Sequence, residues 1–378
     1  MKVLHLIKVK GIGGAEQHLL ALLPSLRQRG VDAQVLSLDA GDDAARFHSA
    51  LDERGVPWQR VATGFDVSPR LGVSVVRAVR AARPDLLHTH MVHGDVYGSV
   101  AANALRLPFV SSRHNDDRYL LGPFRYVDRA FMKRVRRLVA ISDSVREFLA
   151  RAGLPEDRLL TIHYGLDELP SAPSELTPKQ AGIAPGAPLV LAIGRLIAQK
   201  DHDTLLRAFA LAREHHPDAR LAILGWGILE EETRKLVHEL GLAESVVLPG
   251  RVEPRAWLER ADIFAHSSRW EGFGIVLLEA MLAQLPVVAT RVSAIPEIVA
   301  GGQTGLLVEA GDAEGFAAAL TELLDDPSRR TVLGKAGLAR ARAEFSVARM
   351  TRRTIDVYRD ALAESSPTRS PRRRGRDR

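Results

Sequence analysis

The residues best suited to chemistry lie in one stretch of the second half, RWEGFGIVLLE at 269–279. A glycine-rich turn leads there into a helix expected to start near Ile275, and the first amides of such a helix can bind a phosphate. Glu279 lies about one helical turn beyond Ile275 on the same face. Carboxylates accept hydrogen bonds from neighbouring hydroxyl groups, so Glu271 and Glu279 predict a ligand that carries sugar hydroxyls. The apolar neighbours of Glu279 argue against a simple surface glutamate.

Two basic residues predict an anionic part of the same ligand. Gly194 and Arg195 end a predicted strand, and Lys200 follows shortly afterwards. A forked guanidinium and a compact ammonium at the carboxyl edge of a parallel sheet are suited to neutralising a diphosphate. The alternative is a pair of solvated cations near a loop.

A glycine-rich turn also follows the first predicted strand. Gly11, Gly13 and Gly14 lie where a helix opens, so the backbone can approach a ligand closely and helix amides can meet an anion. Their spacing differs from the GxGxxG pattern. A tight turn without any ligand explains these glycines equally well.

A group of histidines follows in the first half. His88 and His90 share one face of a predicted strand, and His93 and Asp95 are expected in the loop after it. These residue types could form a metal site. Contacts with an acceptor molecule and purely structural roles are the alternatives, and the residues alone leave all three open.

The elements that position these residues alternate along the chain. Short apolar runs predict strands at 2–7, 33–38, 86–90, 109–114, 137–142 and 159–164, and then at 189–195, 220–225, 245–250, 262–268, 286–290 and 305–308. Helix-like stretches between them include 14–29, 71–82, 94–106, 124–136, 201–215, 229–240, 275–284 and 312–325. Such alternation is typical of α/β folds whose parallel sheets are covered on both faces.

Prolines divide the chain into two parts. The segment 169–188 holds five of them, and because proline lacks the amide donor of a central strand, we expect a linker there. The parts 1–168 and 189–345 are expected to form two doubly wound, Rossmann-like domains that face a central cleft. A helical stretch at 346–363 is expected to pack back on the first domain, and the basic tail at 365–378 is expected to be disordered.

Composition narrows the class of protein. The 378 residues are 46% hydrophobic and 26% charged, as in ordinary globular proteins, and they include no cysteine. No apolar run reaches the roughly 18 residues of a membrane span, so a cytoplasmic protein is expected. The net charge of +6 suggests nucleic-acid binding, but six arginines lie in the tail at 365–378, which has no aromatic residue for base stacking.

Together these motifs resemble the retaining glycosyltransferases of family 4, which have the GT-B fold of two Rossmann-like domains. Gly194-Arg195, Lys200, Glu271 and Glu279 carry the most specific part of the resemblance. The flanking segments GRLIAQKDHDTLLRAFA, LAILGWG, VVLPGRV and ADIFAHSSRWEGFGIVLLEAMLAQLPVVAT resemble that family's donor domain. Weaker matches are GGAEQHLLALL, PDLLHTHMVHGDVYG, SSRHNDD and VAISDSV.

The resemblance implies a role for each matching residue. Arg195 and Lys200 would neutralise the donor diphosphate, Glu279 would bind the nucleotide ribose, and Glu271 would contact the transferred sugar. His114 would face that sugar near the reaction centre. Backbone or close-approach roles in donor binding are implied for Gly13, Gly14, Gly225, Val252, Phe273, Gly274 and Ile275. Acceptor-side candidates are His90, His93, Asp95, Asn115 and Asp116.

The resemblance also implies the reaction. The enzyme would move a sugar from a UDP- or GDP-sugar to a glycan, a lipid-linked or a small-molecule acceptor in cell-envelope or polysaccharide synthesis. It would need no metal and no cofactor besides the nucleotide-sugar, and no specific nucleic acid. The segment 70–83, with arginines beside valines, and the basic and aromatic segment 119–137 suggest docking on an anionic membrane, which would make the enzyme peripheral on the inner face. The alternative is a helix with one face on the sheet and the other in solvent. Alternatives are a phosphorylase of the same fold, an inactive sugar-nucleotide-binding scaffold and a nucleic-acid-binding protein.

Overall fold

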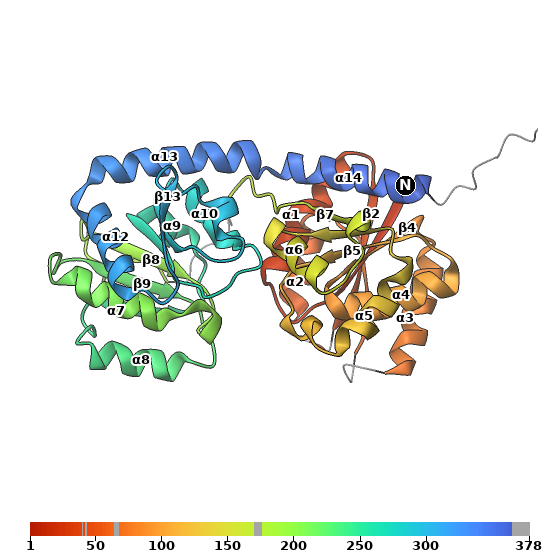
Figure 1. The fold of residues 1–378 in the computed structure, drawn as a ribbon, viewed down its shortest axis with the longest axis horizontal. Coiled ribbons are helices and arrows are strands. Elements are labelled where there is room, and N and C mark those ends of the chain that lie inside the picture. Colours follow the sequence, from red (N-terminus) through yellow and green to blue (C-terminus); the bar gives the residue numbers. More distant parts are fainter. Residues whose placement is uncertain (40, 42–43, 64–67, 170–175, 365–378) are drawn as a thin grey trace, which may run out of the picture.

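The chain forms two α/β units side by side (Figure 1). Its structure is a computed structural model that describes residues 1–364 apart from residues 40, 42–43, 64–67 and 170–175. The predicted tail at 365–378 and part of the predicted linker at 169–188 lie outside the described residues. Each unit is built on one parallel sheet with helices on both faces, so the predicted fold class is confirmed.

The first unit holds a seven-stranded parallel sheet. Its strands, in spatial order, are β3 (Trp58–Ala62), β2 (Asp32–Asp39), β1 (Lys2–Lys8), β4 (Leu86–His90), β5 (Phe109–Arg113), β6 (Arg137–Ala140) and β7 (Leu159–Thr161). The helices are α1 (Gly14–Gln28), α2 (Ala45–Glu53), α3 (Pro69–Ala82), α4 (Met91–Leu105), α5 (Phe124–Phe131) and α6 (Asp143–Arg151). The order of the strands reverses between β1 and β4.

The second unit holds a six-stranded parallel sheet with the same kind of order. Its strands are β10 (Val246–Gly250), β9 (Arg220–Leu224), β8 (Leu189–Ile193), β11 (Ile263–His266), β12 (Val287–Thr290) and β13 (Gly305–Val308). The helices are α7 (His202–Arg213), α8 (Glu230–Glu239), α9 (Arg255–Arg260), α10 (Ile275–Leu282), α11 (Ile295–Ile298), α12 (Ala313–Asp325) and α13 (Pro327–Glu344). Here the order reverses between β8 and β11.

Alternating side chains explain why both faces of the first sheet are covered. Val3 and Ile7 of β1 pack into one hydrophobic cluster with α1 and α2, whereas Leu4 and Leu6 pack into another with α3 and α4. Because both faces are buried, the strands have continuous apolar runs. The points where strand order reverses are the usual ligand sites of such sheets.

The last helix, α14 (Val347–Ala363), joins the two units. It follows α13 of the second unit and lies against the first (Figure 1). Met350, Ile355 and Tyr358 belong to the same hydrophobic cluster as α1 and β1. At the crossing, the Leu166 amide donates to the Phe345 carbonyl at 2.9 Å. The chain therefore passes between the units twice, and the two crossings are bonded to each other.

Several elements differ from the sequence-based expectations. The strand β3 (Trp58–Ala62) was not predicted, because this edge strand has no fully buried residue. The long helix α13 was also missed; its buried residues are few and include two glycines. Helix α4 begins at Met91, directly after β4, so His93 and Asp95 lie in a helix rather than in the expected loop.

Candidate active site

Lys200 and Glu271 form the centre of the candidate site. Lys200 ends a short 3₁₀ turn after β8, and Glu271 follows β11, the neighbouring strand. Because parallel strands end at the same edge, both residues lie at the point where strand order reverses. The Nζ atom of Lys200 is 2.5 Å from Oε2 of Glu271, and both side chains are largely buried.

Two further side chains hold the Glu271 carboxylate. His266 Nε2 and Ser268 Oγ each lie 3.3 Å from Glu271 Oε2. Burial alone would raise the pKa of Glu271, but Lys200 and His266 outweigh it and hold that pKa well below its usual range. Glu271 is therefore a carboxylate under all ordinary conditions, and a diphosphate bound here would share Lys200 with it.

Arg195 is the free cation of the site. Its side chain is exposed and takes part in no ion pair among the residues that the structure describes. It follows Gly194, against which Gly225 packs closely. A Cβ atom at Gly225 would lie 1.8 Å from the Gly194 carbonyl oxygen, and the φ angle of Gly225 is +150°. Only glycine fits there, because the carboxyl ends of β8 and β9 meet at this point.

The helix α10 brings Glu279 to the same edge. Gly274 precedes this helix with a φ angle of +91°, and the buried residues Phe273 and Ile275 flank it. Glu279 is 2% exposed, and Gln17 of the first unit donates to its Oε1 at 3.4 Å. Burial raises the pKa of Glu279 to about 7, and the hydrogen bond from Gln17 offsets this only in part.

The first-unit glycines are arranged differently from the prediction. The Gly13 amide donates to Glu16 Oε2 at 2.9 Å, so a side chain of its own helix satisfies it. Gly14 opens α1, and a Cβ atom there would contact nothing within 4 Å. A phosphate at this turn would have to displace Glu16 from Gly13.

His114 lies where the two units meet. It follows β5 and is 6% exposed, and its ring nitrogens contact Tyr164 and His90. A Cβ atom at Gly272 of the second unit would come within 2.7 Å of the His114 carbonyl oxygen. Both ring nitrogens of His114 are already hydrogen-bonded, so a sugar that contacts one of them would have to break that hydrogen bond. The carbonyl group of His114, in contrast, already faces the second unit.

The structure corrects the acceptor-side prediction for Asp95 and His90. Asp95 is fully buried, bonds to Thr89 and forms an ion pair with Arg113 at 2.7 Å. His90 is also fully buried, with its ring nitrogens bonded to His5 and His114. Neither side chain is accessible to an acceptor, because both stabilise the interior of the first unit.

The remaining predicted residues are more accessible. Asn115 is exposed, and His93 and Asp116 are half-buried near the ends of β4 and β5. Val252 is half-buried in the turn after β10, where its side chain leans on the hydrophobic core. Among the described residues, two groups have possible ligand atoms within 4.8 Å of one another: His5, His88 and His90, and Asp143, His163 and Glu297. His93 and Asp95 belong to no such group in the described part of the chain.

Sequence reasoning missed several residues of the site. His266 and Ser268 lie within a predicted strand, and their alternation could have placed them on the same side as Glu271. Gln17 lies one helical turn after Gly13 and Gly14, so the predicted helix was enough to place Gln17 near that glycine-rich turn. Tyr164 follows β7, and nothing in its neighbourhood indicated contact with His114.

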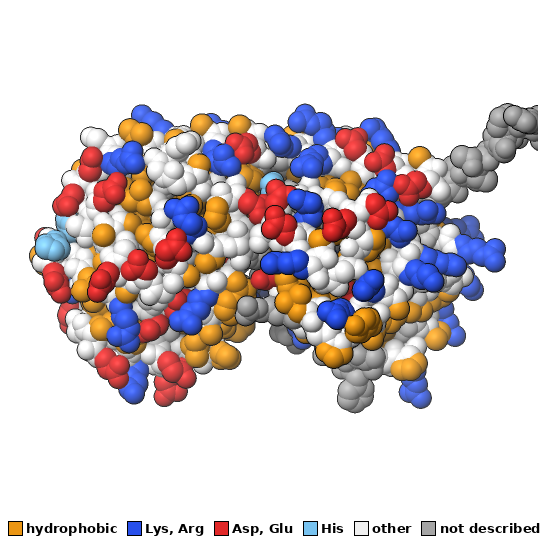
Figure 2. All heavy atoms as spheres, in the orientation of Figure 1, with side chains coloured by type: hydrophobic (Ala, Val, Ile, Leu, Met, Phe, Trp, Pro, Cys, Tyr) orange, Lys and Arg blue, Asp and Glu red, His pale blue; other side chains and the backbone are white. Residues whose placement is uncertain are grey.

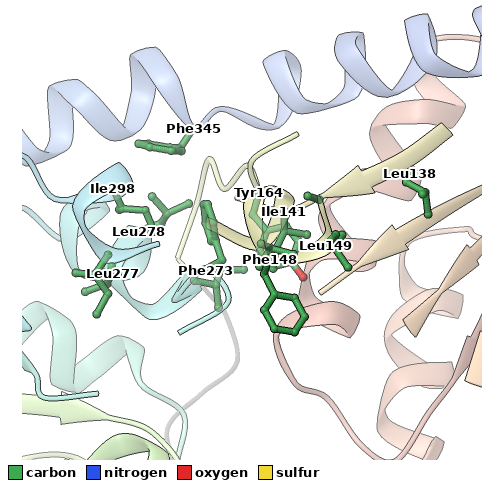
Figure 3. Packing of buried hydrophobic residues seen from close by; sticks show 14 of the residues in the cluster. Leu138, Ile141, Phe148, Leu149, Tyr164, Phe273, Leu277, Leu278, Ile298 and Phe345 are labelled. Atoms are coloured by element: carbon green, nitrogen blue, oxygen red, sulfur yellow. The ribbon is translucent and has the colours of Figure 1, made fainter. Parts of the chain in front are cut away.

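Aromatic side chains fill the contact between the units. The rings of Tyr164 and Phe273 lie 5.0 Å apart, and that of Phe345 is 6.1 Å from Phe273 (Figure 3). Ser142 of the first unit donates to the Gly272 carbonyl at 2.8 Å. The loop that carries Glu271 therefore rests on the first unit.

Two Rossmann-like units with cations and carboxylates at their facing edges define a GT-B glycosyltransferase, and comparisons with known proteins agree. Residues 12–168 match the family model described as Glycosyltransferase Family 4, and residues 173–340 match the model Glycosyl transferases group 1. The chain is 30% identical to a D-inositol 3-phosphate glycosyltransferase of Pseudarthrobacter chlorophenolicus, over 77% of this chain and 75% of that protein. The chain belongs to glycosyltransferase family 4, which confirms the resemblance.

Other similar proteins cover nearly the whole chain. An alpha-maltose-1-phosphate synthase of Mycolicibacterium smegmatis is 29% identical over 93% of this chain and 96% of its own. The crystal structure of Anabaena HepE with UDP and glucose superposes with a TM-score of 0.82 at 24% identity, covering 95% of this chain and 99% of that one. This likeness confirms the GT-B fold. Within the described residues, no helix has the length and apolar character needed to cross a membrane.

Proposed function

We propose that this glycosyltransferase uses a nucleoside-diphosphate sugar as donor and retains the configuration of the transferred sugar. The observation that carries the proposal is the grouping of Lys200, Glu271 and Glu279 around the start of α10. The exposed cation Arg195 directly follows Gly194, where a Cβ atom would lie 3.3 Å from the Lys200 side chain. Two cations and helix amides suit a diphosphate. Two carboxylates suit the hydroxyls of a ribose and of a sugar.

The chemistry of sugar transfer supports these roles. The bond from the sugar to the diphosphate breaks through an oxocarbenium-like state, so positive charge develops on the sugar and negative charge on the departing diphosphate. We expect Lys200 and Arg195 to stabilise the departing diphosphate and Glu271 to face the positive sugar. A retained configuration means that the acceptor hydroxyl enters on the face from which the diphosphate leaves.

We propose that no bound metal takes part. Protein cations supply the charge neutralisation that a divalent ion would give a diphosphate. Lys200 is held within the site by Glu271 rather than extended into solvent. Transfer should therefore continue in excess chelator.

For the base of the donor and for the acceptor, the proposal names classes of molecule rather than single compounds. Anabaena HepE is described in complex with UDP, whereas a relative from Corynebacterium glutamicum, 36% identical over half of this chain, is described as GDP-mannose-dependent. Both nucleotides are candidates. Glycan, lipid-linked and small-molecule hydroxyl acceptors are all compatible with a role in envelope or polysaccharide synthesis.

A surface on the first unit favours an acceptor at a membrane. Exposed apolar side chains gather on and before α5, which lies low on the right-hand unit in Figures 1 and 2; they are Tyr119, Leu121, Phe124, Tyr126 and Val127. Arg129, Lys133 and Arg134 nearby are exposed and basic. Such a surface suits an anionic bilayer. Stronger binding to anionic than to neutral vesicles at low salt, weakened in Tyr126→Ser, is expected; equal binding contradicts the docking.

Calorimetric titration tests the donor proposal. UDP or GDP should bind at least about tenfold more tightly than the matching monophosphate, because Lys200 and Arg195 reach the outer phosphate. The Arg195→Gln variant should lose most of that difference, while Arg207→Gln, an exposed arginine on α7, should keep it. Equal affinity for mono- and diphosphates would contradict the proposal.

An inactive sugar-nucleotide-binding scaffold makes a different prediction. Such a protein would bind the diphosphate with the same preference, yet would release no nucleotide from a nucleotide-sugar over long incubation. The ionised Glu271 held by Lys200 and His266 favours an active site.

A further inference from the structure

Buried histidines and tyrosines of the first unit form a continuous series of hydrogen bonds, which is here called the chain. His114 Nδ1 lies 2.5 Å from the Tyr164 hydroxyl, and His114 Nε2 lies 3.1 Å from Nδ1 of His90. His90 Nε2 is 3.0 Å from Nδ1 of His5. His5 Nε2 in turn lies 3.4 Å from the hydroxyl of Tyr358 on α14. The chain therefore connects the contact between the units with the helix that joins them.

The chain continues past Tyr358 into the sheet. The Tyr358 hydroxyl lies 2.6 Å from His88 Nδ1, and His88 Nε2 lies 2.8 Å from Ser112 Oγ. The fold explains this alignment. His5 pairs with His88 in the register of β1 and β4, and His90 lies two residues further on the same face. This is the face that α1 and α14 cover.

All four histidines are neutral. Burial lowers the pKa of His5 and His114 to about 3 and lowers those of His88 and His90 well below the usual range. A neutral imidazole carries one N–H donor and one acceptor nitrogen. Every contact in the chain then needs a donor on one side and an acceptor on the other, so the choice at one ring determines the choice at the next.

The consequence is a single direction of hydrogen bonding. If Tyr164 donates to His114, then His114, His90 and His5 must carry their hydrogen on Nε2, and His88 does so as well when the Tyr358 hydroxyl accepts from His5 and donates to His88. If the direction is reversed, all four must carry it on Nδ1. Mixed tautomers would place two hydrogens, or two lone pairs, between neighbouring buried nitrogens, and each such contact costs free energy.

We propose that this chain has one hydrogen-bond direction throughout and that Tyr358 and His90 act through it as positioning residues for sugar transfer. The second part rests on the proposed function, in which Glu271 faces the transferred sugar. His114 abuts Gly272 in the loop of Glu271, while Tyr358 belongs to α14, the continuation of α13. A change at Tyr358 is thereby transmitted to the reaction centre by bonded neighbours.

A metal ion held by His5, His88 and His90 is the competing explanation. Their nitrogens lie close enough together, but all of these nitrogens already contact another member of the chain. A divalent ion would also bring two buried positive charges without a carboxylate in the group. The hydrogen-bonded chain is therefore favoured, and it makes a prediction about tautomers that a metal site does not.

Nitrogen-15 NMR of histidine-labelled wild-type protein tests the chain without any assay of activity. Ring nitrogens with and without hydrogen have well-separated shifts, and single His→Asn variants assign them. All four histidines should be neutral and share one tautomer. Mixed tautomers at His5, His90 and His114, or one stoichiometric divalent metal in the purified protein, would overturn the chain.

Removing one hydroxyl tests the positioning role. Tyr358→Phe should shift the ring nitrogens of His114 and lower kcat by about threefold to thirtyfold, with KM for the donor changed less than kcat. Tyr97→Phe is the matched control, because Tyr97 is also buried and its hydroxyl accepts a hydrogen bond from the Ser68 amide, which is not a member of the hydrogen-bonded chain.

The outcomes separate the two proposals. An unchanged kcat and unchanged His114 shifts in Tyr358→Phe would overturn the positioning role, as would an equal loss of kcat in Tyr97→Phe. Absence of any sugar transfer by the wild-type protein would overturn the proposed function instead. In that case the tautomer measurement still decides whether the chain exists.

Discussion

At the scale of single residues, Lys200 and Glu271 show how one contact serves two purposes. Each neutralises the other in a buried place, and together they present a cation and a carboxylate to a ligand. Removing one partner leaves the other buried and only partly compensated, which is costly for folding as well as for function. Substitutions here must therefore be read with a measurement of stability alongside activity.

Lys200→Met should lower kcat/KM for the donor by about a hundredfold or more, because charge that develops on the departing diphosphate loses its main partner. The methionine keeps an unbranched side chain of nearly the same length without the charge. Steady-state kinetics and thermal unfolding measure the two effects separately. Lys235→Met, at a 77% exposed lysine on α8, is the control and should change neither. Wild-type turnover in Lys200→Met would contradict the assignment.

Glu279 should make nucleotide binding depend on pH near neutrality. Its buried carboxyl has a pKa raised to about 7, so it is mostly protonated at pH 6 and mostly ionised at pH 8. The ionised form accepts stronger hydrogen bonds from ribose hydroxyls, so binding should strengthen as the pH rises. Titrations of wild type and Glu279→Gln at both pH values measure this.

The comparison with Glu279→Gln removes the titration of the nucleotide itself, because both proteins bind the same ligand. The ratio of their affinities should grow from pH 6 to pH 8. A constant ratio would show that Glu279 does not change its charge in this range or does not contact the ligand.

Gly225 offers a test of the close approach between β8 and β9. Gly225→Ala would place a Cβ atom 1.8 Å from the Gly194 carbonyl oxygen at a φ angle that alanine avoids. We expect a loss of about 3 kcal/mol or more in the free energy of unfolding, measured in urea. Gly72→Ala, within α3 and free of close contacts, should be neutral or slightly stabilising. Equal stability of the two variants would contradict this packing.

At the scale of elements, the sequence predicted those strands and helices that have a clear pattern of apolar residues. Strands such as β4 and β13 were predicted with their observed bounds, since each is a short buried run between helices. The strand β3 lies at an edge and is partly polar, and α13 buries few large side chains, so neither has a strong pattern. Local periodicity alone does not identify such elements.

The sequence predicted those residues of the candidate site that follow a strand. Lys200 and Glu271 follow neighbouring strands, and the glycine-rich turn before α10 indicated where a helix would start. The burial of His90 and Asp95 was not predictable in the same way. It depends on α4 beginning directly after β4 with Met91 at a φ angle of +62°, and on partners from other strands such as Arg113.

Helix α6 and α11 form a contact that should hold the two units together. Glu297 of α11 accepts hydrogen bonds from the Asp143 and Ser144 amides at the start of α6, and His163 Nε2 lies 2.8 Å from it. A carboxylate at a helix N-terminus is stabilising by about 1 kcal/mol. This contact crosses from one unit to the other.

Glu297→Ala should therefore favour a more open arrangement of the units. We expect a larger radius of gyration in small-angle X-ray scattering without ligand and a higher KM for the donor, with kcat little changed. Glu322→Ala, at an exposed glutamate within α12, is the control. An unchanged scattering profile and KM would show that the contact does not hold the units closed.

At the scale of the whole molecule, we expect sugar transfer to depend on both α/β units and on the two segments that connect them. The donor residues lie on the second unit, Gln17 and His114 reach them from the first, and the crossings at Leu166 and Phe345 are bonded side by side. Sugar transfer needs both units in contact, because water must be excluded from the reacting sugar. The net charge of +6 says little about this, since the charges that matter are local.

Ligand binding should therefore make the molecule more compact. Scattering with a saturating nucleoside diphosphate should show a radius of gyration equal to or smaller than that of the free protein, and the Glu297→Ala variant should show the larger decrease. An increase on binding would contradict closure around the donor.

The most direct test of the account is the product of transfer itself. Wild-type protein is incubated in excess chelator with UDP- and GDP-sugars and a panel of hydroxyl acceptors, and proton NMR records the anomeric configuration of the new linkage. We expect release of the nucleoside diphosphate and a product with the donor's configuration, formed at least about a hundredfold more slowly by Lys200→Met. An inverted product, or transfer that is abolished by the chelator, would contradict it.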